Sequence, residues 1–392
     1  MTVFFDEVID RKNTASLKWD CCKQRFNKED IIPMWVADMD FKSPDRIIQA
    51  IIKRAEHGVY GYTESSEKLA RTIMNWLAKK HQWNVEKSWI VHTPGVVTSL
   101  NAAILSFTNV GDKILMQTPI YYPFYSSIQD NLRELVTNPM KNIDGFYTMD
   151  FDDLEKKLAH GVRMMILCSP HNPIGRVWRQ NELEKVARLC KKYNVILISD
   201  EIHSDIVYKG YKHIPIASLG EEECLNSITL ISPTKTFNIA GLCQSSAIIA
   251  NEQYRRKFKN TINRTGAGML NIFGLEAADT AYSCCEDWLE ELMSYLQSNL
   301  DIVEEYFEKH IPQIKVIKPE ATYMVWLDCN QLPLEMEKLK DFFTLNAGIG
   351  LNDGITFGKE GFGFQRLNFA CPKTLLMEGL ERIEKAVTEL GM

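Results

Sequence analysis

The sequence predicts an α/β protein in which a doubly wound, mainly parallel sheet is flanked by helices and joined to a smaller α+β unit. Three observations predict this class. Short apolar runs alternate with amphipathic segments through the middle of the chain, the pattern of strands followed by covering helices. Helical periodicity dominates the last third of the sequence. The length of 392 residues suits two domains.

The first long helix is predicted to begin at Pro44, with Ser43 as its N-cap and Gly58 at its end. Isoleucines at helical spacing give it an apolar face. A later amphipathic pattern predicts a helix at Asn181–Lys192. Short apolar runs predict the strands of the large sheet at Lys113–Gln117, Arg163–Cys168, Val195–Ser199, Ser227–Ser232 and Ser246–Ala250.

The C-terminal part predicts the second unit. Helical periodicity runs from about Leu270 to Lys309, and a strand at Thr322–Leu327 is followed by helices at Leu334–Asn346 and Lys373–Leu390. No Gly/Ser-rich linker separates the units, so we place the boundary inside the long helical run. The large domain is predicted to comprise residues 44–285, and the small domain residues 1–43 together with 286–392.

Composition excludes several classes of protein. The 45 Lys and Arg against 51 Asp and Glu give a net charge of −6, and no basic run offers the face that nucleic acid requires. The longest stretch without charge, residues 91–111, is broken by Pro94 and Gly95, so no membrane span is expected. Asp6 and Glu7 stand where a secretion signal would be basic. We therefore expect a cytoplasmic protein.

Cysteine and histidine spacing gives no indication of a metal centre. The ten cysteines and eight histidines form no C-x-x-C or H-E-x-x-H pattern. We expect no metal site, and we expect most cysteines to be reduced thiols in the core.

Polar residues follow three of the predicted strands. Asn172, Asp200 and Lys235 each come just after a strand ends, the sheet edge at which open α/β proteins bind ligands. The turn at Thr93–Thr98 contains Gly95 and opens a helix, which leaves free N–H groups for a phosphate. Taken singly, Asn172 fits an ordinary turn, Asp200 fits the N-cap of the next helix, and Lys235 fits an exposed surface lysine. Together, an amine, an acid, an amide and a phosphate cradle are what pyridoxal phosphate requires.

Several longer motifs resemble those of a known enzyme family. Asn172-Pro173-x-Gly175, Asp200 and Ser232-x-x-Lys235 resemble the fold type I pyridoxal-phosphate enzymes, such as aspartate aminotransferase. Within that group, several segments are similar to the MalY/PatB-type C–S lyases, which include cystathionine β-lyase and cystalysin: Lys18–Asp20, Pro33–Phe41, Asp200–His203 and Gly361–Pro372. The similarity extends from the N-terminal segment to the last helix.

The resemblance implies a role for each residue around the cofactor ring. Lys235 would hold pyridoxal phosphate covalently and accept the Cα proton, and Asp200 would pair with the pyridine nitrogen. Asn172 would donate to the ring oxygen. Tyr121 would stack on the ring, and Tyr122 would hydrogen-bond near the reacting centre. Taken without the resemblance, packing within their loop explains both tyrosines equally well.

The remaining contacts implied by the resemblance concern the phosphate and the substrate. Phosphate would be held by the N–H groups of Gly95, Val96 and Val97, the hydroxyls of Ser232 and Thr234, and Tyr62 of the partner subunit in a homodimer. The substrate would be held by Arg366 as a fork on the α-carboxylate, with Val36, Ala37, Tyr121 and Asn172 around it. An ion pair with a buried acid is the other explanation of Arg366.

Two positions depart from the aminotransferase pattern. Cys243 stands where aspartate aminotransferase has an arginine for the phosphate, and His203 replaces a tyrosine at the ring oxygen. These changes favour the C–S lyase branch. The predicted reaction is β-elimination from L-cystathionine, giving homocysteine, pyruvate and ammonia, and from L-cysteine or related thioethers. An aminotransferase on the same scaffold is the alternative, and a regulator-binding protein is an alternative of another class.

Overall fold

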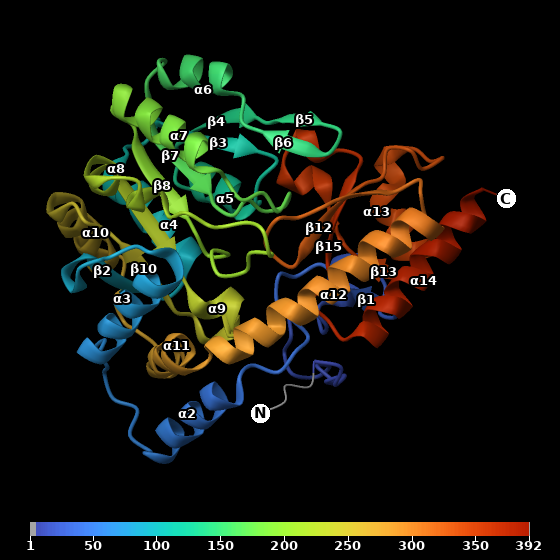
Figure 1. Cartoon of the computed structure of the whole chain (residues 1–392), viewed down its shortest axis with the longest axis horizontal. Helices are drawn as coiled ribbons and strands as arrows, with labels where there is room; N and C mark the ends of the chain where they lie inside the picture. The colour runs from blue at the N-terminus through green and yellow to red at the C-terminus, as the bar shows by residue number, and fades with distance from the viewer. Residues whose placement is uncertain (1–4, 392) are drawn as a thin grey trace.

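The computed structural model describes residues 5–391 and divides into two parts, each built on its own sheet (Figure 1). The large sheet has the strand order β2-β10-β9-β8-β7-β3-β4. Its strands are β2 (Ile90–Thr93), β3 (Lys113–Thr118), β4 (Glu134–Pro139), β7 (Val162–Cys168), β8 (Ile196–Asp200), β9 (Ser227–Ile231) and β10 (Ser245–Ile248). All five strands predicted from apolar runs are therefore present.

Strand direction departs from a purely parallel sheet at one position. Neighbouring strands from β4 to β9 run parallel, whereas β10 runs antiparallel to both β9 and β2. An apolar run of this length shows that a strand is buried but not which way it points. The mainly parallel sheet is confirmed, and the direction of Ser246–Ala250 could not be predicted.

The two faces of the large sheet bury alternate residues of the same strands. Ile114, Ile166 and Ile198 pack with helices α4 and α10 on one face. Their neighbours Leu115 and Leu197 pack with α6 and α7 on the other. Side chains alternate along a strand, so a strand covered on both faces must be apolar throughout. Strands of this kind place their functional residues only beyond their ends.

Helices cover the large sheet and connect its strands. They are α2 (Asp45–Glu56), α3 (Glu67–His81), α4 (Val96–Phe107), α5 (Pro123–Gln129), α6 (Phe151–Leu158), α7 (Gln180–Lys192), α8 (Glu221–Asn226), α9 (Pro233–Thr236), α10 (Glu252–Arg264) and α11 (Ile272–Cys284). A short pair, β5 (Lys141–Ile143) and β6 (Phe146–Thr148), lies beside them. The first long helix begins at Asp45, with Pro44 as its N-cap, one residue later than predicted.

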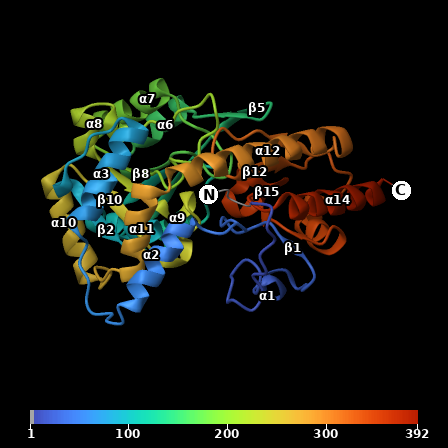
Figure 2. The ribbon, with the colours of Figure 1, turned by 60° about the horizontal axis from the view of Figure 1, so that its bottom comes forward.

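The smaller part combines both ends of the chain. Its antiparallel sheet has the order β11-β12-β15-β14. Near the N-terminus, β1 pairs in parallel with β13, so β1 and α1 lie on the same side of the molecule as β15 and α14 (Figure 2). The elements are α1 (Cys22–Phe26), β1 (Ile32–Pro33), α12 (Glu286–His310), β11 (Lys315–Ile317), β12 (Met324–Asp328), α13 (Leu339–Asp341), β13 (Ile349–Gly350), β14 (Asn352–Asp353), β15 (Phe364–Asn368) and α14 (Lys373–Leu390).

Two predicted helices differ from the structure. The helical run from Leu270 to Lys309 is two helices, α11 and α12, with Cys285 between them. The predicted domain boundary at 285 and 286 falls at this break. The predicted helix at Leu334–Asn346 is a short α13 flanked by a 3₁₀ turn and a π turn. Within residues 5–391, no helix is both long and apolar enough to cross a membrane.

Candidate active site

Three of the predicted site residues lie at or just beyond the carboxyl ends of β7, β8 and β9. Asp200 is the last residue of β8, and Asn172 follows β7. Lys235 lies in α9, the short helix that follows β9. The N-cap of α9 is Ser232, whose hydroxyl oxygen accepts from the Thr234 N–H at 3.1 Å. The three adjacent strands thus bring an amide, an acid and an amine to one edge of the sheet.

The Lys235 amine meets the N-terminal part of the chain. Its Nζ donates to the Ala37 carbonyl oxygen at 2.6 Å, and the Tyr323 hydroxyl donates to the same oxygen at 2.8 Å. Burial, together with the nearby Arg366 charge, lowers the pKa of Lys235 to about 8, although Asp38 and Asp200 oppose the change. A lowered pKa leaves more of the amine unprotonated and able to attack an aldehyde.

Asp200 is a buried acid with little to balance its charge. Its side chain accepts one N–H, from Ile202 at 3.1 Å, and within residues 5–391 it forms no ion pair. Burial raises the pKa of Asp200 to about 7, although the Ile202 N–H and Lys235 oppose the change. A carboxylate in such a place gains from a cationic group. The pyridine nitrogen of pyridoxal phosphate, once protonated, is such a group.

His203 is also buried near the site and incompletely satisfied. Its Nδ1 has no hydrogen-bond partner, and its ring meets the edge of Tyr323 at 6.0 Å between ring centroids. Burial, with Lys235 and Arg366, lowers the pKa of His203 to about 3, so the imidazole is neutral at neutral pH. A buried ring nitrogen without a hydrogen-bond partner is energetically unfavourable. A polar cofactor bound beside His203 would supply that partner.

The turn predicted to hold a phosphate opens helix α4. Gly95 is the N-cap of α4 with φ +152°, and a Cβ built on it would meet nothing within 4 Å. The β10 strand ties this turn to α9, because Ser245 Oγ lies 2.7 Å from Thr93 Oγ1 and Ser232 Oγ donates to the Gln244 carbonyl at 2.6 Å. Free N–H groups at the start of α4, including those of Val96 and Val97, suit an anion.

Arg366 on β15 is fully buried and forms no ion pair with any acid among residues 5–391. Its Nη1 donates to Asn172 Oδ1 at 3.0 Å, and its Nη2 donates to the Trp35 carbonyl at 2.8 Å and to Asn352 Oδ1 at 2.6 Å. The Phe357 ring lies 4.9 Å away. Burial lowers the pKa of Arg366 to about 10, so it remains cationic at neutral pH. This excludes the alternative of a buried ion pair.

The segment before Met39 closes one side of the site. Asn368 Nδ2 donates to the carbonyls of Val36 and Asp38, both at 2.6 Å. These contacts hold Val36 and Ala37 between Lys235 and Arg366. The predicted position of this segment beside the carboxylate site therefore fits the observed geometry.

The three predicted tyrosines lie in different surroundings. Tyr121 and Tyr122 precede α5, with ring centroids 5.1 Å apart, and the Tyr122 ring lies 6.1 Å from that of Phe357. Both are therefore next to Arg366. Tyr62 is fully exposed in the loop between α2 and α3, which runs along the outside of the large part (Figure 1). The structure does not bring Tyr62 to the other site residues of its own chain.

Sequence reasoning missed three side chains of the site. Tyr323 and Asn368 fix the Val36–Asp38 backbone, and Asn352 holds Arg366 through its place opposite Arg366 in the β14–β15 pair. Asn368 lies within the 361–372 motif, which was a usable indication. Tyr323 and Asn352 carried none, because their contacts join positions far apart in the chain.

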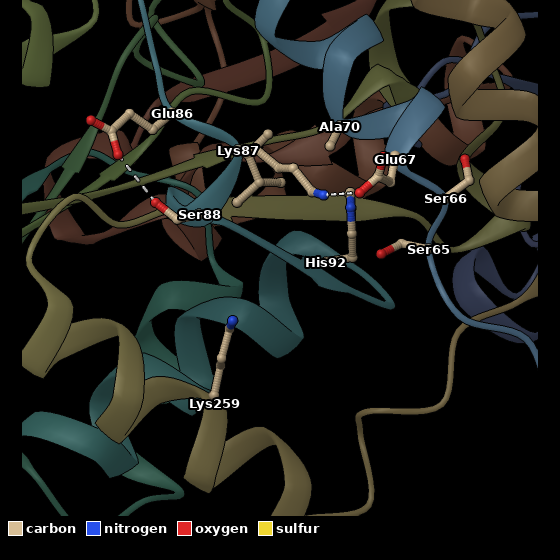
Figure 3. A pocket seen from close by; sticks show the side chains of 10 residues that line it. Ser65, Ser66, Glu67, Ala70, Glu86, Lys87, Ser88, His92 and Lys259 are labelled. Atoms are coloured by element: carbon tan, nitrogen blue, oxygen red, sulfur yellow. Dashed lines mark hydrogen bonds and ion pairs between the residues drawn. The ribbon is translucent and has the colours of Figure 1, made fainter.

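The pocket shown in Figure 3 is a separate place on the large part. Its lining includes Ser66 at the start of α3, Lys87, His92 of β2 and Lys259 of α10, and no predicted site residue. Three of its polar side chains already have partners: Ser66 caps α3, Lys87 pairs with Glu67, and His92 Nδ1 contacts Ser246 Oγ at 3.0 Å. The predicted site residues lie at the sheet edge instead.

A lysine, a buried acid and a phosphate cradle at this edge define the class of pyridoxal-phosphate enzymes with the aminotransferase fold. The family model described as aminotransferase class I and II matches residues 29–383. Cystathionine beta-lyase PatB of Bacillus subtilis is 40% identical over 98% of this chain and 100% of its own. Protein MalY of Escherichia coli is 32% identical over 98% of both chains.

Solved structures agree. Cystalysin from Treponema denticola, which contains pyridoxal 5'-phosphate, has a TM-score of 0.97 at 36% identity over the whole of both chains. The pyridoxal-phosphate-bound C–S lyase from Staphylococcus hominis has a TM-score of 0.93 at 33% identity over 99% of this chain and 98% of its own. The chain belongs to the aminotransferase class I and II family and, within it, to the MalY/PatB-type C–S lyases.

The predicted fold type, family and cofactor are thereby confirmed. The protein is a pyridoxal-phosphate-dependent carbon–sulfur lyase.

Proposed function

We propose that the protein cleaves the Cβ–S bond of S-substituted L-cysteines, with L-cystathionine and L-cysteine as substrates. The observation that carries this proposal is Arg366, a buried guanidinium that pairs with no acid in the described part of the chain and whose surroundings also include the Lys235 amine. The ligand that satisfies both is an α-amino acid, whose carboxylate takes the fork of Arg366 and whose Cα then lies near Lys235.

Each site residue has a separate role in binding the substrate or the cofactor. Asn172 and Asn352 aim the guanidinium at the substrate carboxylate. Asp200 would hold the proton of the pyridine nitrogen, while Gly95, Val96, Val97 and Thr234 would hold the phosphate. Tyr121 would pack on the ring, and Asn172 and His203 would hydrogen-bond to its oxygen. Ser232 acts mainly through Thr234, because its own proton goes to Gln244.

Bound pyridoxal phosphate supplies an electron sink for the negative charge that forms at Cα. Lys235, whose lowered pKa suits a base at neutral pH, takes the Cα proton. The electron pair of that C–H bond then forms a Cα–Cβ double bond as the Cβ–S bond breaks and a thiolate leaves. We assign protonation of the thiolate to Tyr122, whose hydroxyl is a proton donor and whose side chain is partly exposed. The released 2-aminoacrylate is hydrolysed by water to pyruvate and ammonia.

The active unit in this proposal is a homodimer. The loop between α2 and α3 exposes Val59, Tyr60 and Tyr62 together, and an exposed apolar group of this kind marks an interaction surface. Tyr62 of the partner subunit would complete the phosphate site. Light scattering should give a mass of two chains, and Tyr62→Ala should weaken cofactor binding; a monomer with full activity would contradict this part of the proposal.

We also place the protein in the cytoplasm. All ten cysteines are free thiols, and Cys243 and Cys284 are exposed, a state that a reducing compartment preserves. Cell fractionation followed by immunodetection tests this placement, and recovery of the protein outside the cytoplasm would contradict it.

One experiment separates elimination from amino transfer. Purified protein is incubated with L-cystathionine in the absence of any keto acid, and pyruvate and free thiol are measured. We expect equal amounts of both to accumulate over many turnovers. Product that appears only when 2-oxoglutarate is added, with formation of glutamate, would identify an aminotransferase instead. Lys235→Ala is the negative control.

A further inference from the structure

The backbone from Trp35 to Phe41 is held by side chains at almost every carbonyl oxygen. The Trp35 carbonyl accepts from Arg366, and the Ala37 carbonyl accepts from Lys235 and Tyr323. The Met39 and Phe41 carbonyls both accept from Asn238 Nδ2, at 3.0 and 2.7 Å. Two residues with proposed roles in catalysis and binding thus contact this segment directly. Its position therefore decides where their charged groups lie.

The acidic side chains of this segment are held by a residue from far along the chain. Arg11 binds the Asp38 carboxylate as a fork, with Nη1 at 3.0 Å from Oδ1 and Nη2 at 2.7 Å from Oδ2. The same Nη1 lies 2.7 Å from Asp40 Oδ1 and 3.3 Å from the Met39 carbonyl oxygen. One guanidinium therefore joins two carboxylates and a backbone oxygen. Parallel hydrogen bonds of this kind fix direction as well as distance.

Asp40 is fixed from the other side by two further residues. Lys18 Nζ lies 2.6 Å from Asp40 Oδ2, and Trp19 Nε1 donates to Asp40 Oδ1 at 2.8 Å. Both Lys18 and Asp40 are buried. Burial alone would raise the pKa of Asp40, but Lys18, Trp19 and Arg11 hold it below its usual value. Lys18 Nζ also lies 3.7 Å from Asp38 Oδ1, but the short contacts to the Asp38 carboxylate come from Arg11, which therefore links Asp38 to the buried Asp40–Lys18 pair.

Asp38 lies close enough to the site to act on its charges. Of the charged groups around the Lys235 amine, the Asp38 carboxylate has the largest effect on its pKa and favours the protonated form. In the chain, Asp38 directly follows Ala37, whose carbonyl receives the Lys235 amine. A shift of the Asp38 side chain would therefore move the carbonyl and the carboxylate that face Lys235 together.

We infer that Arg11 is a positioning residue for the β-elimination. It joins Asp38 to Asp40. It thereby keeps the Ala37 carbonyl against the Lys235 amine and the Trp35 carbonyl against the Arg366 guanidinium. This inference rests on the proposed function, because it assigns Arg11 a part in the same reaction. Arg11 itself touches neither the cofactor nor the substrate; it acts through the backbone of residues 35–39.

The test uses the cofactor-loaded enzyme and three variants. Arg11→Gln removes the charge and the fork, and Arg11→Lys keeps only the charge. Arg46→Gln is the matched control, because Arg46 also binds an aspartate, Asp287 at 2.7 Å, but lies on the surface of α2. For each, kcat and KM for L-cysteine and L-cystathionine are measured per bound cofactor, with the pH profile of the cofactor absorbance.

We expect Arg11→Gln to lower kcat/KM about 10- to 100-fold for both substrates alike, the range expected when charge-assisted hydrogen bonds are lost. The KM should rise as well as kcat fall, since the 35–39 backbone meets both Arg366 and Lys235. Arg11→Lys should recover part of the loss, and the midpoint of the absorbance titration should shift in Arg11→Gln. Arg46→Gln should match the wild type throughout.

A double-mutant cycle with Asp38→Asn locates the effect. If Arg11 acts through Asp38, the double variant should lose little more than either single variant. Additive losses, or an Arg11→Gln enzyme that is merely less stable with unchanged kcat and KM per bound cofactor, would overturn the inference. Should Arg11→Gln not fold, Arg11→Lys and Asp38→Asn carry the same test. A wild type that binds no cofactor or releases no thiol would instead refute the proposed function.

Discussion

Two regions at the carboxyl edge of the large sheet differ in how their charged groups are satisfied. Asp200 and Glu201 are adjacent and both buried. Glu201 Oε1 accepts from Ser199 Oγ at 2.8 Å and from the Ile216 N–H at 3.2 Å, and its Oε2 lies 2.8 Å from His213 Nε2. Within residues 5–391, the Asp200 side chain accepts only the Ile202 N–H. The protein therefore satisfies the hydrogen-bonding capacity of Glu201 and leaves most of that of Asp200 for a ligand.

The same division occurs at the next strand. Thr236 Oγ1 donates to Asp205 Oδ2 at 3.0 Å, and Asp205 also receives Trp76 Nε1 and His81 Nε2, both at 3.0 Å. The amine of Lys235, which precedes Thr236, has the Ala37 carbonyl as its only hydrogen-bond partner among the described residues. Residues on the satisfied side fix the sheet edge and α9, whereas we propose that those on the open side perform the chemistry. Buried charge without a partner is thus the mark of the functional side.

The largest effect is expected at Lys235. Lys235→Ala removes both the covalent attachment of the cofactor and the base, so the absorbance band of the lysine-bound cofactor should disappear and turnover should fall by at least about 10⁴-fold. Absorption spectra and pyruvate release measure both effects. A colourless wild type that cannot be loaded with pyridoxal phosphate would contradict the entire assignment.

Asp200 should come next. Asp200→Asn keeps the shape and removes the charge that holds the pyridine proton, so the cofactor should still bind while turnover falls by about 10² to 10⁴. Steady-state kinetics on the loaded variant check this. Turnover close to that of the wild type would place Asp200 with Glu201 on the structural side.

Arg366 should show a smaller loss that does not depend on the leaving group. Arg366→Lys supplies the charge but not the fork, so kcat/KM should fall about 10- to 100-fold. The fractional loss should be nearly equal for L-cysteine and L-cystathionine, with cofactor absorbance unchanged. A loss confined to L-cystathionine, or release of the cofactor, would show that Arg366 does not bind the α-carboxylate.

Substitutions of Asp200 and of Glu201 should change the free energy of unfolding in opposite directions. Glu201→Gln disturbs three satisfied contacts and should lower the free energy of unfolding by about 1–3 kcal/mol, with kcat/KM per bound cofactor unchanged. Asp200→Asn should instead stabilise the cofactor-free protein at pH 8, by at most about 4 kcal/mol. Urea unfolding of the cofactor-free proteins measures both changes.

The pH dependence follows from the raised pKa of Asp200, about 7 in the folded protein against an unfolded value near 3.9. Between about pH 4 and 7 the folded chain keeps a proton that the unfolded chain has released, so stability falls as pH rises through this window. The advantage of Asp200→Asn should therefore vanish near pH 4. If Asp200→Asn stabilised the protein equally at pH 4 and pH 8, burial would not be the cause of the raised pKa of Asp200.

Much of the fold and the site could be predicted because local sequence determines them. The strands before Asn172, Asp200 and Lys235 are apolar on both faces, so polar residues beyond their ends had to share one edge. Gly95 at the start of α4 likewise follows from local pattern. The direction of β10 and the break at Cys285 did not, because burial gives an apolar strand no direction and helical periodicity can continue across a single non-helical residue.

The rest of the site depends on contacts between distant segments. Tyr323 meets Ala37, and Arg11 meets Asp38, through packing of the N-terminal part against the smaller sheet. Hydrogen bonds to backbone carbonyls, such as that of Arg366 to Trp35, leave no pattern in residue identity, since every residue offers the same oxygen. Such contacts are visible only in the folded structure.

The most direct test of the division between Asp200 and Glu201 is exchange of the Cα proton of L-alanine in D₂O. L-alanine has no leaving group, so the exchange reports proton removal alone, measured by NMR on loaded enzyme. We predict exchange in the wild type and at nearly the same rate in Glu201→Gln, with a rate about 10² to 10⁴ lower in Asp200→Asn. Equal rates in Asp200→Asn and the wild type would contradict the account.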